Sequence, residues 1–201
     1  MEYRDVLRQR RMVRNYSPEA VSEDVLERVV QAARRAPSAG FSQGTAFVIV
    51  TEPELRSAIA DLCDEPEYVA AGFDPWISKA PAHIVVCVSE EAYHQRYREP
   101  DKIDDQGNEI DWPVPFWWID GGAALMLVLL TAVDEGLAAG FLGTDAEDLR
   151  SLLGIPDAMV PIGIVTVGHP APDRRSSSLQ RGWRSADQVI HWQTWGPHSP
   201  A

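Results

Sequence analysis

Hydrophobic and polar positions along this chain fall into two kinds of pattern, one helical and one extended. Apolar residues recur at helical spacing in segments bounded by proline, glycine or capping residues. This pattern predicts helices, counted with their caps, at residues 2–12, 22–35, 54–62, 90–98, 116–135 and 145–153. Continuous apolar runs, typical of buried strands, occupy residues 46–50, 82–88 and 161–168.

The predicted helix at residues 116–135 is apolar almost all round in its centre, residues 123–133. A helix of this kind is expected to be buried on every side. In a domain of 201 residues, a second subunit is one way to cover it. Its longest apolar run, residues 121–133, is shorter than the 20 or so residues that a membrane span needs.

Residues 100–115 form a polar, acidic segment bounded by prolines. Loops of this length without regular structure are often lids or binding loops. The segment leads into an aromatic group made of Trp112, Phe116, Trp117 and Trp118. If exposed, this group is a binding surface for planar molecules; if buried, it is core or subunit interface. The sequence leaves both interpretations open.

The end of the chain is rich in arginine and serine, yet residues 189–195 carry two tryptophans and an aliphatic pair. A disordered tail would not have this composition. We therefore expect residues 171–201 to form an arm that docks on its own body or on a partner.

Composition narrows the function classes. Hydrophobic residues make up 45% of the chain and charged residues 24%, as in a globular domain, and the formal net charge is −12. An acidic chain of this kind is not expected to bind nucleic acid. Cys63 and Cys87 lie in apolar surroundings without metal-ligand spacing, which favours structural thiols. With a charged N-terminal segment unlike a signal peptide, they indicate a reducing, cytoplasmic location and no membrane.

Three arginines, Arg10, Arg11 and Arg14, fall within five residues of this acidic chain. Their planar guanidinium groups suit phosphate, so the cluster indicates a bound anion. If this stretch is helical, Arg10 and Arg14 share a face. Arginines near the C-terminus could meet the same anion. A solvated basic turn at a helix end remains the alternative.

Residues 37–44 form a loop of small residues that exposes backbone amides. It could lie flat against a planar ligand, or it could simply connect a helix to a strand. No P-loop and no glycine-rich dinucleotide motif with its ribose-binding acid is present, so a Rossmann site is unsupported.

Several of these motifs occur in the order found in the nitroreductase family, which consists of FMN-dependent NAD(P)H oxidoreductases. The resemblance rests on residues 10–17, 36–43, 140–145, 152–156, 161–170 and 189–192, and so it covers most of the chain. It implies an α+β fold with a mostly antiparallel central sheet flanked by helices. It further implies an intertwined homodimer in which a C-terminal extension reaches the other subunit and both chains build each FMN site. The domain would span residues 1–201, with residues 100–115 as a lid or loop insertion.

The resemblance also assigns residues to FMN. Arg10 and Arg14 would hold the phosphate and the ribityl or pyrimidine edge, and a backbone amide at Leu142 or Gly143 would approach flavin N5. Either Arg181 or Arg184 would complete the phosphate site. The full cofactor set is Arg10, Arg11, Met12, Arg14, Pro37, Ser38, Ala39, Gly40, Gln43, Leu142, Gly143, Arg181 and Arg184.

The acceptor side departs from the family pattern. Phe41 stands where many members have an asparagine near the flavin, and Gly44-Thr45 replaces Pro-Trp. Phe41 and the aromatic group at residues 112–118 are the substrate-contact candidates. The resemblance implies ping-pong transfer of hydride from NAD(P)H through FMN to a nitroaromatic, a quinone or a similar acceptor, since the flavin carries the chemistry. Dehalogenation, flavin conversion and flavin binding without turnover are the alternatives.

Overall fold

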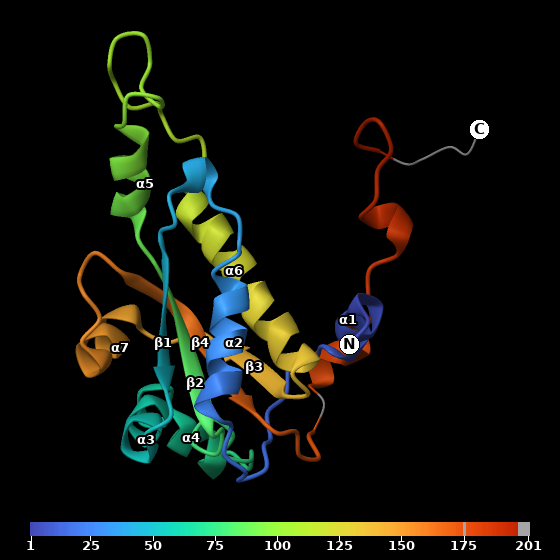
Figure 1. Cartoon of the computed structure of the whole chain (residues 1–201). Helices are drawn as coiled ribbons and strands as arrows, with labels where there is room; N and C mark the ends of the chain where they lie inside the picture. Colours follow the sequence, from blue (N-terminus) through green and yellow to red (C-terminus); the bar gives the residue numbers. More distant parts are fainter. Residues whose placement is uncertain (175, 197–201) are drawn as a thin grey trace.

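The computed structural model describes residues 1–174 and 176–196. Its centre is a four-stranded antiparallel sheet with strand order β1-β2-β4-β3 (Figure 1). The strands are β1 (Thr45–Val50), β2 (Ala82–Val88), β3 (Ala138–Leu142) and β4 (Val160–Gly168). The prediction of an α+β fold with an antiparallel central sheet is confirmed.

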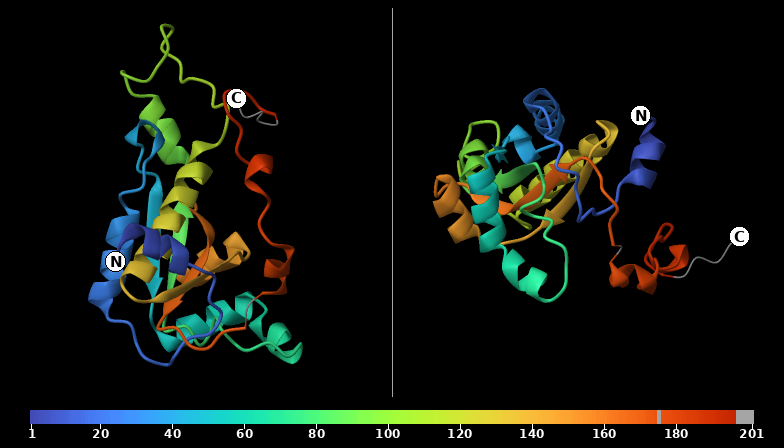
Figure 2. Two further views of the ribbon diagram at one scale, coloured as in Figure 1. Left: turned by 90° about the vertical axis from the view of Figure 1, so that its right-hand side faces the viewer. Right: turned by 90° about the horizontal axis from the view of Figure 1, so that it is seen from below.

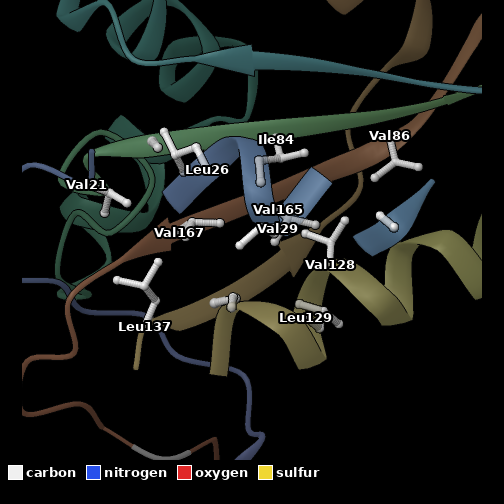
Figure 3. Packing of buried hydrophobic residues seen from close by; sticks show 14 residues of the cluster. Val21, Leu26, Val29, Ile84, Val86, Val128, Leu129, Leu137, Val165 and Val167 are labelled. Atoms are coloured by element: carbon white, nitrogen blue, oxygen red, sulfur yellow. The ribbon is translucent and has the colours of Figure 1, made fainter. Parts of the chain in front are cut away.

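Helices cover both faces of the sheet. One face packs against α2 (Glu23–Ala33) and α6 (Phe116–Asp134), and the other packs against α3 (Pro53–Leu62) and α7 (Ala146–Leu153). Side chains of a strand alternate between faces, so Ile84 and Val86 of β2 join the first core and Val85 and Cys87 join the second. Figure 3 shows the first core, where α2 and α6 meet the sheet. The remaining helices are α1 (Tyr3–Gln9), α4 (Glu65–Ala70) and α5 (Glu90–Tyr97).

All six predicted helices are present, but three details differ from the sequence prediction. The first helix ends at Gln9, because the chain beyond it pairs with β3. β1 was expected to be buried, yet Ala46 and Ile49 are exposed, since β1 is an edge strand of this sheet. The sequence prediction also lacked β3 and α4, whose five and six residues are too short to show a period.

The long helix α6 is only partly buried. One side of it packs on the sheet and α2, while Trp118, Ile119 and Met126 are 45%, 54% and 44% exposed. The expectation of burial on every side is therefore wrong within the single chain. By length and composition alone α6 could cross a membrane, but one side of it packs with α2 on the sheet, as a core helix does.

Two segments extend beyond the layered body (Figures 1 and 2). Residues 100–115 contain no helix or strand and are fastened to α5 by hydrogen bonds. The arm after Pro172 forms two short 3₁₀ turns, η2 (Ser177–Arg181) and η3 (Ala186–Gln188), and runs away from the body. Trp183 and Trp195 on this arm are 95% and 89% exposed. Residues 175 and 197–201 of the predicted arm lie outside the described residues.

Candidate functional site

The arginine stretch at residues 10–14 is extended, not helical. Met12 forms a parallel bridge with Ala139 of β3, and the Val13 amide donates to the Ala139 carbonyl at 3.0 Å. The expectation that Arg10 and Arg14 share a helix face is therefore wrong. Pairing with β3 outweighs the weak local preference for helix.

A close approach fixes this stretch against β3. A Cβ atom on Gly140 would lie 2.4 Å from the Val13 carbonyl oxygen, so only glycine allows the contact. On the other side, the buried Tyr16 hydroxyl lies 3.0 Å from the same carbonyl and 2.7 Å from Thr166 Oγ1. Burial raises the pKa of Tyr16, so the hydroxyl stays protonated as a donor.

The three arginines differ in their partners. Arg11 forms an ion pair with Asp173 at 3.1 Å, and the same carboxylate accepts the Arg14 amide at 3.1 Å. In residues 1–174 and 176–196, the guanidinium groups of Arg10 and Arg14 have no carboxylate partner. That of Arg14 lies over the Trp76 ring, 5.6 Å from its centroid. Two unpaired cations in an acidic chain fit an anionic ligand.

The strand that holds the arginines leads toward the predicted flavin N5 contact. Ala139 of β3 lies beside Met12, the strand continues to Leu142, and Gly143 follows directly and is exposed. At about 3.3 Å per residue, Gly143 lies about 13 Å along the chain from Ala139. One FMN could bridge this distance between its ring and its phosphate. We call residues 10–14 with Leu142 and Gly143 the arginine half.

The small-residue loop at residues 37–44 lies at the other end of α6 (Figure 1). The Ala39 amide donates to Asp120 Oδ2 at 2.9 Å, and Arg96 Nε donates to the Gly40 carbonyl at 2.9 Å. The backbone N–H of Gln43 donates to Ser38 Oγ at 3.0 Å. We call this loop the loop half; it contains the predicted cofactor residues Pro37, Ser38, Ala39, Gly40 and Gln43.

The loop half and the arginines do not meet within one protomer. The loop is bonded to Asp120 near the start of α6, whereas Met12 pairs with β3, which begins soon after α6 ends. The helix rises about 21 Å between Asp120 and Asp134. One chain therefore presents two separate half-sites.

The C-terminal arginines are also separate from Arg10 and Arg14. Arg181 and Arg184 are exposed on the arm, which leads away from the body in Figure 2. Arg184 donates to the Gln188 carbonyl at 3.0 Å. Among the residues that the structure describes, the arginines of the two termini do not converge on a single anion within one chain.

Some of the aromatic candidates are exposed, as a binding surface would be, and others are buried, as core residues are. Trp117 is buried, and Trp112 and Phe116 are half-buried in the same cluster, where the Trp112 and Tyr97 ring centroids lie 4.3 Å apart. Trp118 is exposed on α6. The predicted substrate residue Phe41 is 74% exposed on the loop half.

The sequence prediction missed three residues that organise these half-sites: Asp120, Arg96 and Asp173. Asp120 could have been found, because it is an acidic residue next to the long apolar run of the predicted helix. Arg96 and Asp173 lie among many charged residues and give no such signal.

Comparison with known proteins identifies the family. Residues 7–169 match the family model described as Nitroreductase family. This match covers most of the chain, so the protein belongs to the nitroreductase family, as the motifs indicated.

Relatives of the same family extend over nearly the whole chain. A protein of Archaeoglobus fulgidus named putative NADH dehydrogenase/NAD(P)H nitroreductase is 29% identical over 82% of this chain and 83% of its own length. An FMN reductase of Bacillus subtilis is 26% identical over 92% of this chain and 71% of its own. The solved structure of B. megaterium NfrA1 matches with a TM-score of 0.75 at 22% identity, covering 98% of this chain and 76% of that one.

Proposed function

We propose that this protein is an FMN-dependent oxidoreductase that uses NAD(P)H to reduce an electron-poor acceptor, such as a nitroaromatic or a quinone. The observation that carries this proposal is the arginine half. It offers two unpaired guanidinium groups at one end and the exposed Gly143 at the other, in a chain of the nitroreductase family. The names of the relatives, NAD(P)H nitroreductase and FMN reductase, support the same chemistry.

The residues of the arginine half fit FMN in a specific order. Arg10 would hold the phosphate by charge-assisted hydrogen bonds, with Arg14 at the ribityl or pyrimidine edge and Arg11 kept aside by Asp173. The amide at Gly143 would face the ring, and Arg14 would stabilise negative charge on the reduced ring system. When bound, FMN supplies the redox chemistry, taking hydride from NAD(P)H and passing it to the acceptor in alternating half-reactions.

A homodimer completes the site in this proposal. The loop half of one protomer would meet the arginine half of the other, and Arg181 or Arg184 of the partner's arm would join the phosphate. The exposed apolar side chains of α6 and the tryptophans of the arm support this arrangement, because both need covering. The free thiols Cys63 and Cys87 suit the reducing cytoplasmic location that we include in the proposal.

Anaerobic mixing of the purified protein with NADH and NADPH tests the proposal. Bleaching of the visible flavin band, followed by recovery when a quinone is added, is the expected result. A flavin that remains oxidised with both donors would identify a flavin-binding protein without turnover. A donor-reduced flavin that recovers only with a halogenated substrate, or is itself consumed, would identify a divergent family member. If the purified protein is colourless and does not bind added FMN, the arginines bind another anion.

A further inference from the structure

Asp120 is a buried carboxylate on the apolar helix α6. It is 7% exposed and accepts two hydrogen bonds, from the Tyr93 hydroxyl at 2.7 Å and from the Ala39 amide at 2.9 Å. A buried carboxylate is costly unless donors satisfy it, and these two come from different parts of the chain. Asp120 therefore joins α6, α5 and the loop half at one point.

The loop half needs such support because its backbone is strained. Phe41 and Gln43 have φ angles of 59° and 53°, in the left-handed region that side chains other than glycine disfavour. Gly40 has a φ of 60° and lies against the Tyr97 ring. It lies between the two hydrogen bonds that hold the loop, one from the Ala39 amide to Asp120 and one from Arg96 to the Gly40 carbonyl. Strained backbone of this kind persists only where the surrounding structure fixes it.

This strained loop backbone determines where Phe41 lies. The Ala39 amide is held by Asp120 and the Gly40 carbonyl by Arg96, so the two residues before Phe41 are fixed from inside. The Phe41 side chain, by contrast, is 74% exposed. The loop thus presents an aromatic ring outward on a rigid base.

We propose that Asp120 is a positioning residue, which fixes the Ala39 amide so that Phe41 lies against a planar acceptor and favours acceptors of that shape. The inference rests on the proposed function, in which the loop half of one protomer faces the flavin held by its partner. Flat aromatic and quinone rings, the acceptors of the proposed function, can stack on phenylalanine. Phe41 is the specificity-determining residue, and Asp120 acts through it.

The test measures kcat and KM of the FMN-loaded enzyme with two acceptors. One is 1,4-naphthoquinone, a planar ring, and the other is ferricyanide, which has no ring to stack. For Asp120→Ala we expect KM for naphthoquinone to rise about tenfold, with ferricyanide reduction per bound FMN within twofold of wild type. Phe41→Ala should give the same change, and the double variant should add nothing to it, because both act on one contact.

Three further variants separate positioning from mere stability. Tyr93→Phe removes the other donor to Asp120 and should leave KM within twofold, although it lowers the melting temperature. Asp120→Asn keeps an oxygen at the position of Oδ2, which accepts both the Ala39 amide and the Tyr93 hydroxyl, so KM should stay within threefold. Ala39→Pro replaces the amide hydrogen that points at Asp120 by a ring carbon, which displaces the loop from the carboxylate, so it should raise KM for naphthoquinone at least as far as Asp120→Ala does.

The proposal is overturned if Ala39→Pro or Asp120→Ala leaves KM for naphthoquinone unchanged, or raises KM equally for ferricyanide. It is also overturned if Asp120→Asn behaves like Asp120→Ala, since the negative charge would then matter and not the placement of the loop. Wild-type enzyme that reduces neither acceptor would refute the proposed function itself, which is a separate result.

Discussion

The arginine half and the loop half differ in what they offer a ligand: the first offers charge and the second a fixed surface. The arginine half has an ordinary extended backbone, paired with β3, and it offers the unpaired charges of Arg10 and Arg14. In the loop half the charged residues Asp120 and Arg96 are already bonded to the loop, which offers shape instead. An anion needs charge, and a flat ring needs a fixed surface. The difference suits the proposed division, in which the arginine half takes the anionic cofactor and the loop half takes flat rings.

The strongest test of this division removes the arm. A chain ending at Asp173 lacks Arg181, Arg184 and the exposed tryptophans, so we expect a monomer that retains FMN at least a hundredfold more weakly, a loss of about 2.7 kcal/mol. Light scattering after size exclusion and flavin absorbance of the ultrafiltrate measure both effects. A truncated chain that remains dimeric and yellow would contradict the role of the arm.

A matched variant separates the charge of the arm from its docking. The double change Arg181→Gln and Arg184→Gln keeps the tryptophans, so the protein should stay dimeric while FMN affinity falls about tenfold. If this variant instead becomes monomeric, the arginines act in docking and not at the phosphate.

Within the arginine half, Arg14 and Arg11 form a matched pair. Arg14→Gln should weaken FMN binding by about 1.5–3 kcal/mol, the usual contribution of a hydrogen bond to a charged group. Arg11→Gln should change FMN affinity by less than threefold, because Asp173 already occupies Arg11. Fluorescence titration of apoprotein with FMN measures both constants. Equal losses in the two variants would mean that the ion pair does not exclude Arg11 from the phosphate.

The sequence predicted the fold well where its pattern was long. The helix at residues 116–135 and the strands at 82–88 and 161–168 agree with α6, β2 and β4 to within a residue at each end. Such elements bury a continuous apolar face, so their periodicity is visible without knowledge of their neighbours.

Tertiary pairing explains most of what the sequence could not show. Arg10–Arg14 is extended only because β3, more than a hundred residues later, pairs with it. Likewise, the roles of Asp173 and Arg96 depend on partners that are distant in sequence. Asp173 pairs with Arg11, and Arg96 donates to the Gly40 carbonyl. The separation of the two half-sites is also a property of the folded chain. The assignments of residues to FMN and to the acceptor stay predictions until the variants described here are measured.

In the loop half, Phe41→Gly should show how much stability the protein loses by holding Phe41 at a positive φ. Glycine adopts a positive φ freely, and little packing is lost at an exposed side chain, so the free energy of unfolding should rise by about 0.5–1 kcal/mol. Urea denaturation measures this gain, while KM for naphthoquinone should rise. The matched change Phe41→Ala relieves no strain and should not stabilise the protein. Destabilisation by glycine would show that Phe41 packs in the free protein.

The smallest expected effect lies beside the loop half, where a histidine holds the acidic segment 100–115. His94 is bonded to Glu109 and Glu90, and Arg98 and Trp112 bond to Glu109 as well. The hydrogen bond to Glu109 raises the pKa of His94 above 6.5, and bonds from Trp112 and His94 lower the pKa of Glu109 below 4.5. The histidine stabilises the folded state fully below its unfolded pKa and the carboxylate fully above its own. Both contributions are therefore complete between about pH 4.5 and 6.5.

His94→Gln should consequently destabilise the protein near pH 6 by less than about 1 kcal/mol, the range of partly exposed ion pairs. The difference from wild type should shrink as pH rises through the raised pKa of His94, since neutral imidazole loses most of its attraction to Glu109. Arg28→Gln is the control, because its partner Glu135, at the other end of α6, pairs with it at 2.8 Å and neither group titrates between pH 6 and 9. Its effect on urea midpoints should stay constant over that range. A His94→Gln difference equally constant from pH 6 to 9 would show that the charge of His94 does not hold the segment.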